Sequence, residues 1–548
     1  MQEFCFIPMF YKPFFRTYCL IFFSCFGSLY NLNAQDGYQR HKSIDVLSYD
    51  FSLALSDTTD RILGLAEIVI LATHTISSFE LELDEKDKDN MGMIVERLKV
   101  DNKGMPYTHS KDKIHVDLPN PVQQNDTIRV SIEYAGIPSD GLYIHKNQFG
   151  QRTFFGDNWP NRAHYWLPCI DHPSDKAMVR FSVLAPLNYR VISNGVLQEE
   201  TIWDESLKLT VWEELIPVPL KVAVIGVAPF AVKYEGEVAG VELSSWVYNK
   251  NRTAGFYDYE EAKKVIEYFT ERIGLFPFKK LANVQSTTKY GGMENASCIF
   301  YSQSSVTGLQ DQEELLAHEI AHQWFGDYIT EEDWMHIWLS EGFATFFEAH
   351  YVEYAMGQEA YKKKLSADRQ KIILDKKHLK KPIIDTTIKD YNDLLNVNSY
   401  EKGGWVLYML RLKLGEEIFW SGLQNYVQKY KGKNVRTENF QQCMEETSKS
   451  DLKMFFDQWV YKAGIPALDI KWQYDEQQSE LIIDVTQNQD NLFTFPLELG
   501  ISYAEKDQID AVIPIEVANN KLSQFKIKVT KKPIKVVTDP NLKLLAIY

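Results

Sequence analysis

Two histidines and two glutamates stand at spacings that suit a metal-dependent hydrolase. His318 and His322 are four residues apart, so on a helix both imidazoles lie on one face and reach the same ion. Glu341 follows after a gap of 18 residues, in a second helix-compatible stretch, and would complete three protein ligands. Catalytic zinc takes three such ligands and keeps a fourth position for water. Glu319, beside the first histidine, is well placed to take a proton from that water.

The same short pattern also occurs in ordinary helices, so the surrounding residues decide what it means. Glu313, Leu316 and Ile320 suit a helix with one apolar face, and no proline or glycine interrupts it before Gly326. Glu341 stands in a helix-compatible stretch of its own. Chance is therefore a poor explanation for the occurrence of all three predicted ligands together. The sequence therefore predicts a metal site.

A glycine pair upstream of the metal residues is the second element. Gly291 and Gly292 precede Met293 and Glu294, and a strand-like stretch follows. Glycines at a strand entrance leave the backbone open, so an extended substrate can lie against it while Glu294 offers a carboxylate. A simple turn with a solvated glutamate is the better explanation of these residues when they are taken alone. Tyr400, further along the chain, could donate a hydrogen bond from its hydroxyl to a developing oxyanion, although a tyrosine at such a place more often only packs.

These elements, in this order, resemble the gluzincin zinc aminopeptidases, the family of aminopeptidase N and the leukotriene hydrolase. The family fingerprint is G-x-M-E-N, then HExxH with a glutamate 19 positions after its second histidine, then a tyrosine in Y-x-K-G. All three parts stand here at the expected separations, and the likeness runs from about residue 40 to the C-terminus. Weaker landmarks of the family are found at Pro168–Ala177, His322–Asp327, Gln458–Trp459 and Gly464–Pro466.

The resemblance implies a role for each matching residue. One zinc ion would be held by His318, His322 and Glu341, with Glu319 as general base and Tyr400 as the donor that stabilises the oxyanion. Glu294 would bind the free α-amino group of a peptide, so that one residue is removed from the amino end. The substrate groove would also be lined by Gly291, Gly292 and Met293.

Several positions depart from the family pattern. Ser340 stands where the family usually has asparagine, and we expect little effect from this change. Asp157 and Trp159 occupy the stretch that normally contacts the amine and the first side-chain pocket, and either of them is a candidate substrate contact. Thr345 lies one turn after Glu341, where it would support a metal ligand or simply be a buried helix threonine.

Three functions remain open at this stage. The leading interpretation is a zinc aminopeptidase of broad or neutral preference. A zinc endopeptidase would use the same metal ligands, and a catalytically inactive peptide-binding scaffold would keep the fold. An epoxide hydrolase side activity is a weaker alternative that rests only on likeness to the leukotriene hydrolase.

Composition adds limits on location and partners. The formal charge of −16 over 548 residues gives no basic patch for nucleic acid, and we expect no nucleic-acid partner. Lys12 and Arg16 precede an apolar stretch from 18 to 30, which predicts a signal peptide cleaved after Ala34 and a secreted or periplasmic protein. The stretch is short for a membrane span, so membrane association is not expected, although an uncleaved anchor is the alternative. Cys169, Cys298 and Cys443 would remain, and an odd number predicts no disulfide framework.

The hydrophobic period predicts a multidomain α+β protein. Strand-like alternation, as in Ile128–Tyr134, precedes residue 232, and an amphipathic helix at 262–273 begins a helical region with a long helical stretch from 400 to 430. Strands return after Pro466. We expect a signal peptide (1–34), a β-rich N-terminal domain (35–232), a thermolysin-like zinc catalytic domain (233–466) and a small β-sandwich (467–548), without the helical C-terminal domain of many relatives. The oligomeric state and the preferred N-terminal residue stay open.

Overall fold

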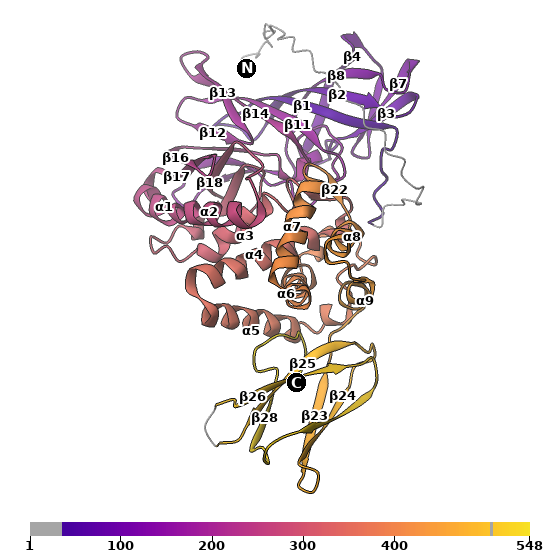
Figure 1. Cartoon of the computed structure of the whole chain (residues 1–548). Coiled ribbons are helices and arrows are strands. Elements are labelled where there is room, and N and C mark those ends of the chain that lie inside the picture. The colour runs from indigo at the N-terminus through magenta and orange to yellow at the C-terminus, as the bar shows by residue number, and fades with distance from the viewer. Residues whose placement is uncertain (1–35, 505–507) are drawn as a thin grey trace.

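Strands, helices and strands again follow one another along the long axis of the molecule (Figure 1). The computed structural model describes residues 36–504 and 508–548, so the predicted signal peptide lies outside the described residues. The order of elements confirms the predicted α+β class, with a β-rich N-terminal part, a helical middle and C-terminal sheets.

The N-terminal part is built on an eight-stranded sheet. Its strands are antiparallel except where β1 pairs with β11 in parallel, and the predicted alternation is confirmed because Ile128, Val130, Ile132 and Tyr134 are all buried. A three-stranded sheet and a four-stranded sheet complete this part. The eight-stranded sheet runs β13 (Val196–Ile202), β14 (Leu207–Val218), β11 (Ala177–Pro186), β1 (Ile44–Ala54), β2 (Ile62–Ala72), β8 (Thr127–Ile137), β4 (Gly92–Val100), β5 (Lys103–Gly104). The smaller sheets run β3 (Ile76–Glu82), β7 (Lys113–Val122), β6 (Tyr107–Ser110), and β12 (Arg190–Ser193), β15 (Ile225–Ala228), β10 (Arg152–Gly156), β9 (Leu142–Lys146).

A five-stranded sheet leads into the helical part. It runs β16 (Phe230–Val238), β17 (Val241–Tyr248), β18 (Lys280–Ser286), β20 (Cys298–Ser302), β19 (Gly292–Met293), so the glycine pair lies at its edge. The change from strands to helices was expected at 233 and occurs after Tyr248 instead, because β16 and β17 form an antiparallel hairpin across that point. The predicted domain boundaries themselves stay predictions.

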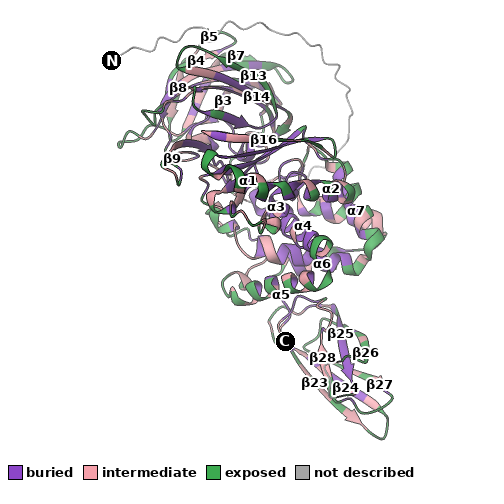
Figure 2. Ribbon diagram, turned by 90° about the vertical axis from the view of Figure 1, so that its left-hand side faces the viewer, coloured by how far each residue is buried: buried purple, intermediate pink, exposed green. Residues whose placement is uncertain are grey.

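The helices that carry the site pack in the middle of the molecule, and α4 is buried along most of its length (Figure 2). The amphipathic helix predicted at 262–273 is α2, and its apolar face is buried as expected. The helices are α1 (Arg252–Asp258), α2 (Ala262–Ile273), α3 (Glu313–His322), α4 (Trp338–Met356), α5 (Gln358–Leu374), α6 (Gly403–Leu414), α7 (Glu416–Tyr430), α8 (Thr437–Ser448), α9 (Lys453–Phe456).

The long helical stretch predicted at 400–430 is confirmed, and it is divided into three helical segments. A π-helical turn covers Asn398–Lys402, α6 follows it, and Gly415 separates α6 from α7. Gly415 has φ 81°, a left-handed conformation that ends α-helices and that glycine adopts without steric penalty. The turn matters for the site because it carries Tyr400.

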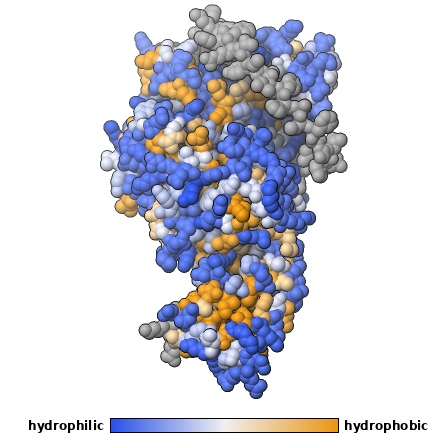
Figure 3. Space-filling view, viewed as in Figure 1, coloured by the Kyte–Doolittle hydropathy of each residue, from blue (hydrophilic) through white to orange (hydrophobic). Residues whose placement is uncertain are grey.

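Two three-stranded sheets form the C-terminal part. One runs β23 (Leu468–Asp475), β24 (Glu480–Gln487), β27 (Leu522–Lys528), and the other β26 (Ala511–Val517), β25 (Phe495–Ser502), β28 (Lys535–Thr538). The face shown in Figure 3 is mostly hydrophilic, as the net charge suggests, and an apolar area gathers on this C-terminal part.

Two glycines let α4 and the π-helical turn approach closely. A Cβ on Gly342 would lie 2.9 Å from the Gly403 Cα and 3.2 Å from the Ser399 carbonyl oxygen. A flexible side chain could move away from such a contact, but these neighbouring atoms belong to the backbone and cannot move as easily. We conclude that the position of Tyr400 depends on this glycine contact.

Gly342→Ala should therefore separate α4 from the turn. Overpacking of this kind costs about 1–3 kcal/mol, and each kcal/mol lowers Tm by roughly 2–4 °C in a domain of this size. Thermal unfolding followed by circular dichroism measures the shift. Gly104→Ala is the matched control, because a Cβ there meets nothing within 4 Å; equal Tm values for the two variants would contradict the expectation.

Candidate active site

The predicted metal ligands meet where α3 and the first turn of α4 cross. Nε2 of His318 lies 3.5 Å, and Nε2 of His322 lies 3.3 Å, from Oε2 of Glu341. The three ligand atoms all lie within 4.8 Å of one another, and two nitrogens with one carboxylate oxygen are donors that zinc accepts in catalytic sites. The geometry and the donor types therefore fit one zinc ion.

The other nitrogen of each imidazole has its own partner. Nδ1 of His318 lies 3.0 Å from Oε2 of Glu348, and Nδ1 of His322 lies 2.9 Å from the Ser340 hydroxyl and 3.2 Å from the Phe325 carbonyl oxygen. A hydrogen bond donated from Nδ1 leaves the lone pair of Nε2 free for a metal. The two histidines are thus oriented by different groups, one charged and one neutral.

The sequence analysis missed the partner of His318 and underrated Ser340. Glu348 stands seven residues after Glu341, two helical turns along the same face of α4, which was the available signal. Thr345, the residue considered instead, donates its hydroxyl to the Glu341 carbonyl oxygen at 2.8 Å within its own helix. The hydroxyl of Thr345 is therefore used within α4 itself.

Lys364 on α5 forms an ion pair with the Glu348 carboxylate oxygen that does not contact His318. Its ammonium lies 2.6 Å from Oε1 of Glu348. Burial alone would raise the pKa of Glu348, but the hydrogen bond from His318 and the charge of Lys364 lower this pKa to about 2. The Glu348 carboxyl group is therefore ionised when it accepts the hydrogen bond from the His318 imidazole.

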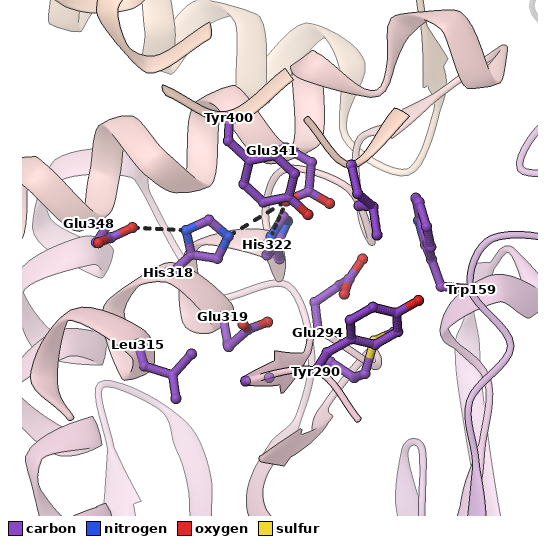
Figure 4. A pocket seen from close by; sticks show the side chains of 14 residues that line it. Trp159, Tyr290, Glu294, Leu315, His318, Glu319, His322, Glu341, Glu348 and Tyr400 are labelled. Carbon is purple, nitrogen blue, oxygen red and sulfur yellow. Dashed lines mark hydrogen bonds and ion pairs between the residues drawn. The ribbon is translucent and has the colours of Figure 1, made fainter. Parts of the chain in front are cut away.

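Glu319 faces the cavity beside the metal ligands (Figure 4). Burial raises its pKa to about 7 in the metal-free protein, with Glu294 and Glu341 adding to the rise and the two imidazoles opposing it. A carboxylate with a pKa near neutrality both accepts and returns protons efficiently. A Cβ on Gly292 would overlap the Glu319 carboxylate, so glycine at this position of β19 leaves the space that Glu319 occupies.

Glu294 follows the edge strand β19 and is only 5% exposed. Its backbone carbonyl accepts a hydrogen bond from Nε2 of Gln323 at 2.8 Å. Its carboxylate oxygen Oε1 is buried and has no hydrogen-bond partner among the described residues. A buried carboxylate oxygen without a partner is costly, so this arrangement indicates a cationic group that binds there.

Tyr400 lies over the metal ligands (Figure 4). Its ring is nearly parallel to that of His318, with ring centroids 5.9 Å apart. Burial, together with the carboxylates of Glu341, Glu294 and Glu319, raises the pKa of Tyr400 well above its ordinary value. The phenol therefore keeps its proton and can donate a hydrogen bond.

A cavity of about 380 Å³ joins these groups. It is lined by Trp159, Tyr290, Gly291, Gly292, Met293, Glu294, Leu315, His318, Glu319, His322, Glu341, Glu348, Leu395 and Tyr400. Trp159 and Tyr290 lie on the Glu294 side, and Leu315 and Glu348 lie on the His318 side (Figure 4). The volume suits one amino-acid residue and part of the next.

The structure separates the two substrate contacts that the sequence left open. Trp159 lines the cavity, whereas Asp157 is not among the lining residues. The Asp157 carboxylate is buried and pairs with Arg162. Asp157 as a substrate contact is therefore not supported by its placement, because its charge is already balanced behind the cavity wall.

Comparison with known families agrees with this site. The sequence profile of the peptidase family M1 domain matches residues 257–459, and that of the peptidase M1 N-terminal domain matches residues 46–219. The chain belongs to peptidase family M1. The predicted resemblance is thereby confirmed, and the single zinc ion predicted from the ligand spacing agrees with the family.

Curated relatives of this M1 chain are aminopeptidases. The glutamyl aminopeptidase of Bos taurus is 27% identical over 404 residues, which are 69% of this chain and 42% of the bovine protein. Probable aminopeptidase 1 of Sulfurisphaera tokodaii is 26% identical over 452 residues, 76% of this chain and 55% of that protein. The chain therefore spans about half the length, or less, of these relatives.

Solved structures show the same fold. An M1 zinc metallopeptidase from Deinococcus radiodurans matches with TM-score 0.67 and 23% identity, over 76% of this chain and 94% of that one. Aminopeptidase A from Legionella pneumophila, in complex with aspartic acid, matches with TM-score 0.79 and 17% identity, over 94% of this chain and 60% of that one.

Two further observations concern location and redox chemistry. In the described part of the chain no helix is both long enough and apolar enough to cross a membrane. Cys169, Cys298 and Cys443 are buried free thiols. Burial raises the pKa of Cys298 to about 12, so this thiol stays protonated near neutral pH.

Glu348→Gln should weaken zinc binding by about 10- to 100-fold, because the substitution removes the charge that supports His318 and keeps the shape of the side chain. Competition with a chromogenic chelator measures the affinity directly and needs no substrate. Glu359→Gln is the matched control, since the Glu359 side chain is 92% exposed on α5. Zinc affinity of Glu348→Gln within two-fold of the control would contradict the role of Glu348.

Proposed function

We propose that this chain is a zinc aminopeptidase that removes single residues from the free amino end of peptides. The observation that carries the proposal is Glu294, whose buried and unpartnered carboxylate oxygen opens into the cavity of a zinc site. A peptide α-ammonium group would supply the missing partner. A carboxylate–ammonium hydrogen bond is worth roughly 1.5–3 kcal/mol, and it sets the distance from the amino end to the cleaved bond.

The chain's own residues divide the remaining work. His318, His322 and Glu341 would hold the ion, which supplies Lewis acidity and an acidified water when bound. Glu319 takes the proton of the attacking water and passes it to the departing amine. Its buried position beside the ligands, in the lining of the cavity, suits both transfers.

Tyr400 and the edge strand position the reacting carbonyl. The protonated Tyr400 phenol donates to the oxygen that gains negative charge, a contact worth about 100- to 1,000-fold in turnover. β19 ends the five-stranded sheet, and its residues Gly292 and Met293 line the cavity. A peptide would pair with the free edge of β19 and present its first bond to Glu319.

The first side-chain pocket favours neutral residues in our proposal. Relatives in the comparison are glutamyl aminopeptidases, a name that points to acidic N-terminal residues in those proteins. Among the described residues that line this cavity, none is lysine or arginine, and four are glutamates. Trp159 and Tyr290 offer aromatic surface on the side of Glu294 (Figure 4), and Met293 adds apolar surface to the cavity lining. An acidic side chain would therefore meet repulsion without a compensating cation.

We also propose a cellular location for the enzyme and boundaries for its catalytic domain. Lys12, Arg16 and the apolar stretch that ends before Ala34 support export from the cytoplasm, with removal of the first 34 residues. The boundaries at 232 and 466 are proposed as the limits of the catalytic unit, and peptides with a free N-terminus as the substrates. A retained anchor would be detected as an intact N-terminus in mass spectrometry of the exported protein.

Release of a fluorophore from aminoacyl amides tests the activity. We expect cleavage of leucyl and alanyl amides, at least about 10-fold slower cleavage of the glutamyl amide, and none of the N-acetylated copies. Chelation should abolish cleavage and zinc should restore it. Cleavage of acetylated peptides would indicate an endopeptidase, silence of the zinc-loaded protein would indicate a binding scaffold, and a glutamyl preference would overturn the proposed pocket.

Tyr400→Phe should lower kcat by about 100- to 1,000-fold while zinc content stays at one ion per chain, because only the donated hydrogen bond is lost. Initial rates with leucyl amide, together with metal analysis, measure both quantities. Tyr234→Phe serves as the control, since Tyr234 is 62% exposed and far from the cavity lining. A loss below 10-fold would remove Tyr400 from the role of oxyanion donor.

A further inference from the structure

Residues Asp36–His41, which we call the N-terminal strap, contact parts of the chain that are hundreds of residues away in sequence. The Asp36 carboxylate lies at the centre of these contacts. Its Oδ2 lies 2.8 Å from Nε2 of His172 and accepts the Trp334 backbone N–H at 3.2 Å. Both the Asp36 and the His172 side chains are fully shielded from solvent.

Further contacts surround the Asp36–His172 pair. Nδ1 of His172 lies 2.7 Å from the Ser174 hydroxyl and 3.2 Å from the Ser174 backbone nitrogen, on the side of the ring away from Asp36. The other oxygen of Asp36 accepts the Tyr38 backbone N–H at 3.0 Å. Asp36 is thus a buried carboxylate held by three donors, and its orientation is fixed.

Arg40 attaches the other end of the strap. Its Nη1 lies 2.8 Å from Oε1 of Glu332, and its Nη2 donates to the Glu332 carbonyl oxygen at 2.5 Å. Glu332 lies two residues before Trp334. The strap therefore holds the segment 332–334 at two points, one on each side of the residue Asp333.

Trp334 transmits this attachment to the cavity. Its ring is fully buried and meets the ring of Trp159 edge to face, with centroids 5.7 Å apart. Tyr391 stacks on Trp334 at 5.4 Å and directs its hydroxyl to the Asp36 carbonyl oxygen at 3.4 Å. Trp159 lines the cavity directly, and Tyr391 begins the short helix that leads to Leu395, another lining residue.

We propose that the N-terminal strap positions the apolar wall of the first substrate pocket, acting through Trp334 and Tyr391 on Trp159 and Leu395. The strap touches neither substrate nor metal, so Asp36 and Arg40 are positioning residues. The proposal rests on the proposed function in one respect, since it assigns the wall a part in choosing the N-terminal residue of a peptide. The claim that the strap holds the wall in position rests only on the contacts described above.

Asp36→Ala removes the three accepted hydrogen bonds and tests both parts. Hydrogen exchange should become faster in peptides that cover 155–159 and 391–396, with the zinc-ligand helices unchanged. The preference for leucyl over alanyl amide should fall by roughly 2- to 30-fold, through a higher KM for the leucyl substrate at an unchanged kcat for the alanyl one. Zinc content should stay at the wild-type value.

Gln39→Ala is the matched control on the same strap, because the Gln39 side chain is exposed. Arg40→Gln is the second variant, which loosens the strap without creating a cavity beside Trp334 and keeps the test decisive if Asp36→Ala does not fold. Exchange and selectivity in both strap variants equal to those of Gln39→Ala would overturn the proposal. Faster exchange at the strap alone, with unchanged selectivity, would overturn it as well.

The outcome is separable from the test of the aminopeptidase activity. If the wild-type protein cleaved no aminoacyl amide, the proposed function would fail, while hydrogen exchange at 155–159 and 391–396 would still decide whether the strap holds the wall. If the wild-type protein is active and the strap variants show fast exchange with reduced selectivity, both proposals are supported.

Discussion

The crossing of α3 and α4 is the constraint on which the rest of the site depends. It brings two imidazole nitrogens within 3.5 Å of one carboxylate oxygen, a cluster that is favourable only with a cation between them or protons on the rings. The back of each ring is held as well, His318 by the ionised Glu348 and His322 by Ser340. A misplaced helix would break all of these contacts together, since they share the same two helices.

Glycine makes this density of groups possible. Gly292 leaves room for the Glu319 carboxylate against the edge strand, and Gly342 lets the π-helical turn with Tyr400 lie directly on α4. The sheet edge, the two metal helices and the turn therefore meet within one cavity. The side chains that line the cavity come from several elements, which is how a packed scaffold fixes several side chains at once.

The cavity is asymmetric in charge and in support. Four glutamates and the two histidines of the predicted metal site line the cavity, and Trp159, Tyr290 and Met293 add apolar surface to the lining. Trp159 in turn rests on Trp334, which is held by the strap from the start of the described chain. The side of the cavity formed by Trp159 is therefore supported by segments at 36, 334 and 391, which lie far apart in the sequence.

Spacing along the sequence by itself predicted the metal ligands and Glu319, because a histidine pair on one helix face is a local pattern. The roles predicted for Glu294 and Tyr400 came from the resemblance to the family, since each residue taken alone is explained by packing or a simple turn. Alternation determined the strands at 128–134 and the helix at 262–273, because such periods are local patterns as well. Tertiary structure decided the rest. Asp157 turned out to pair with Arg162, Glu348 and Ser340 to orient the histidines, and Asp36 to reach Trp334. These contacts join residues whose partners depend on how whole elements pack, and no local period records that packing.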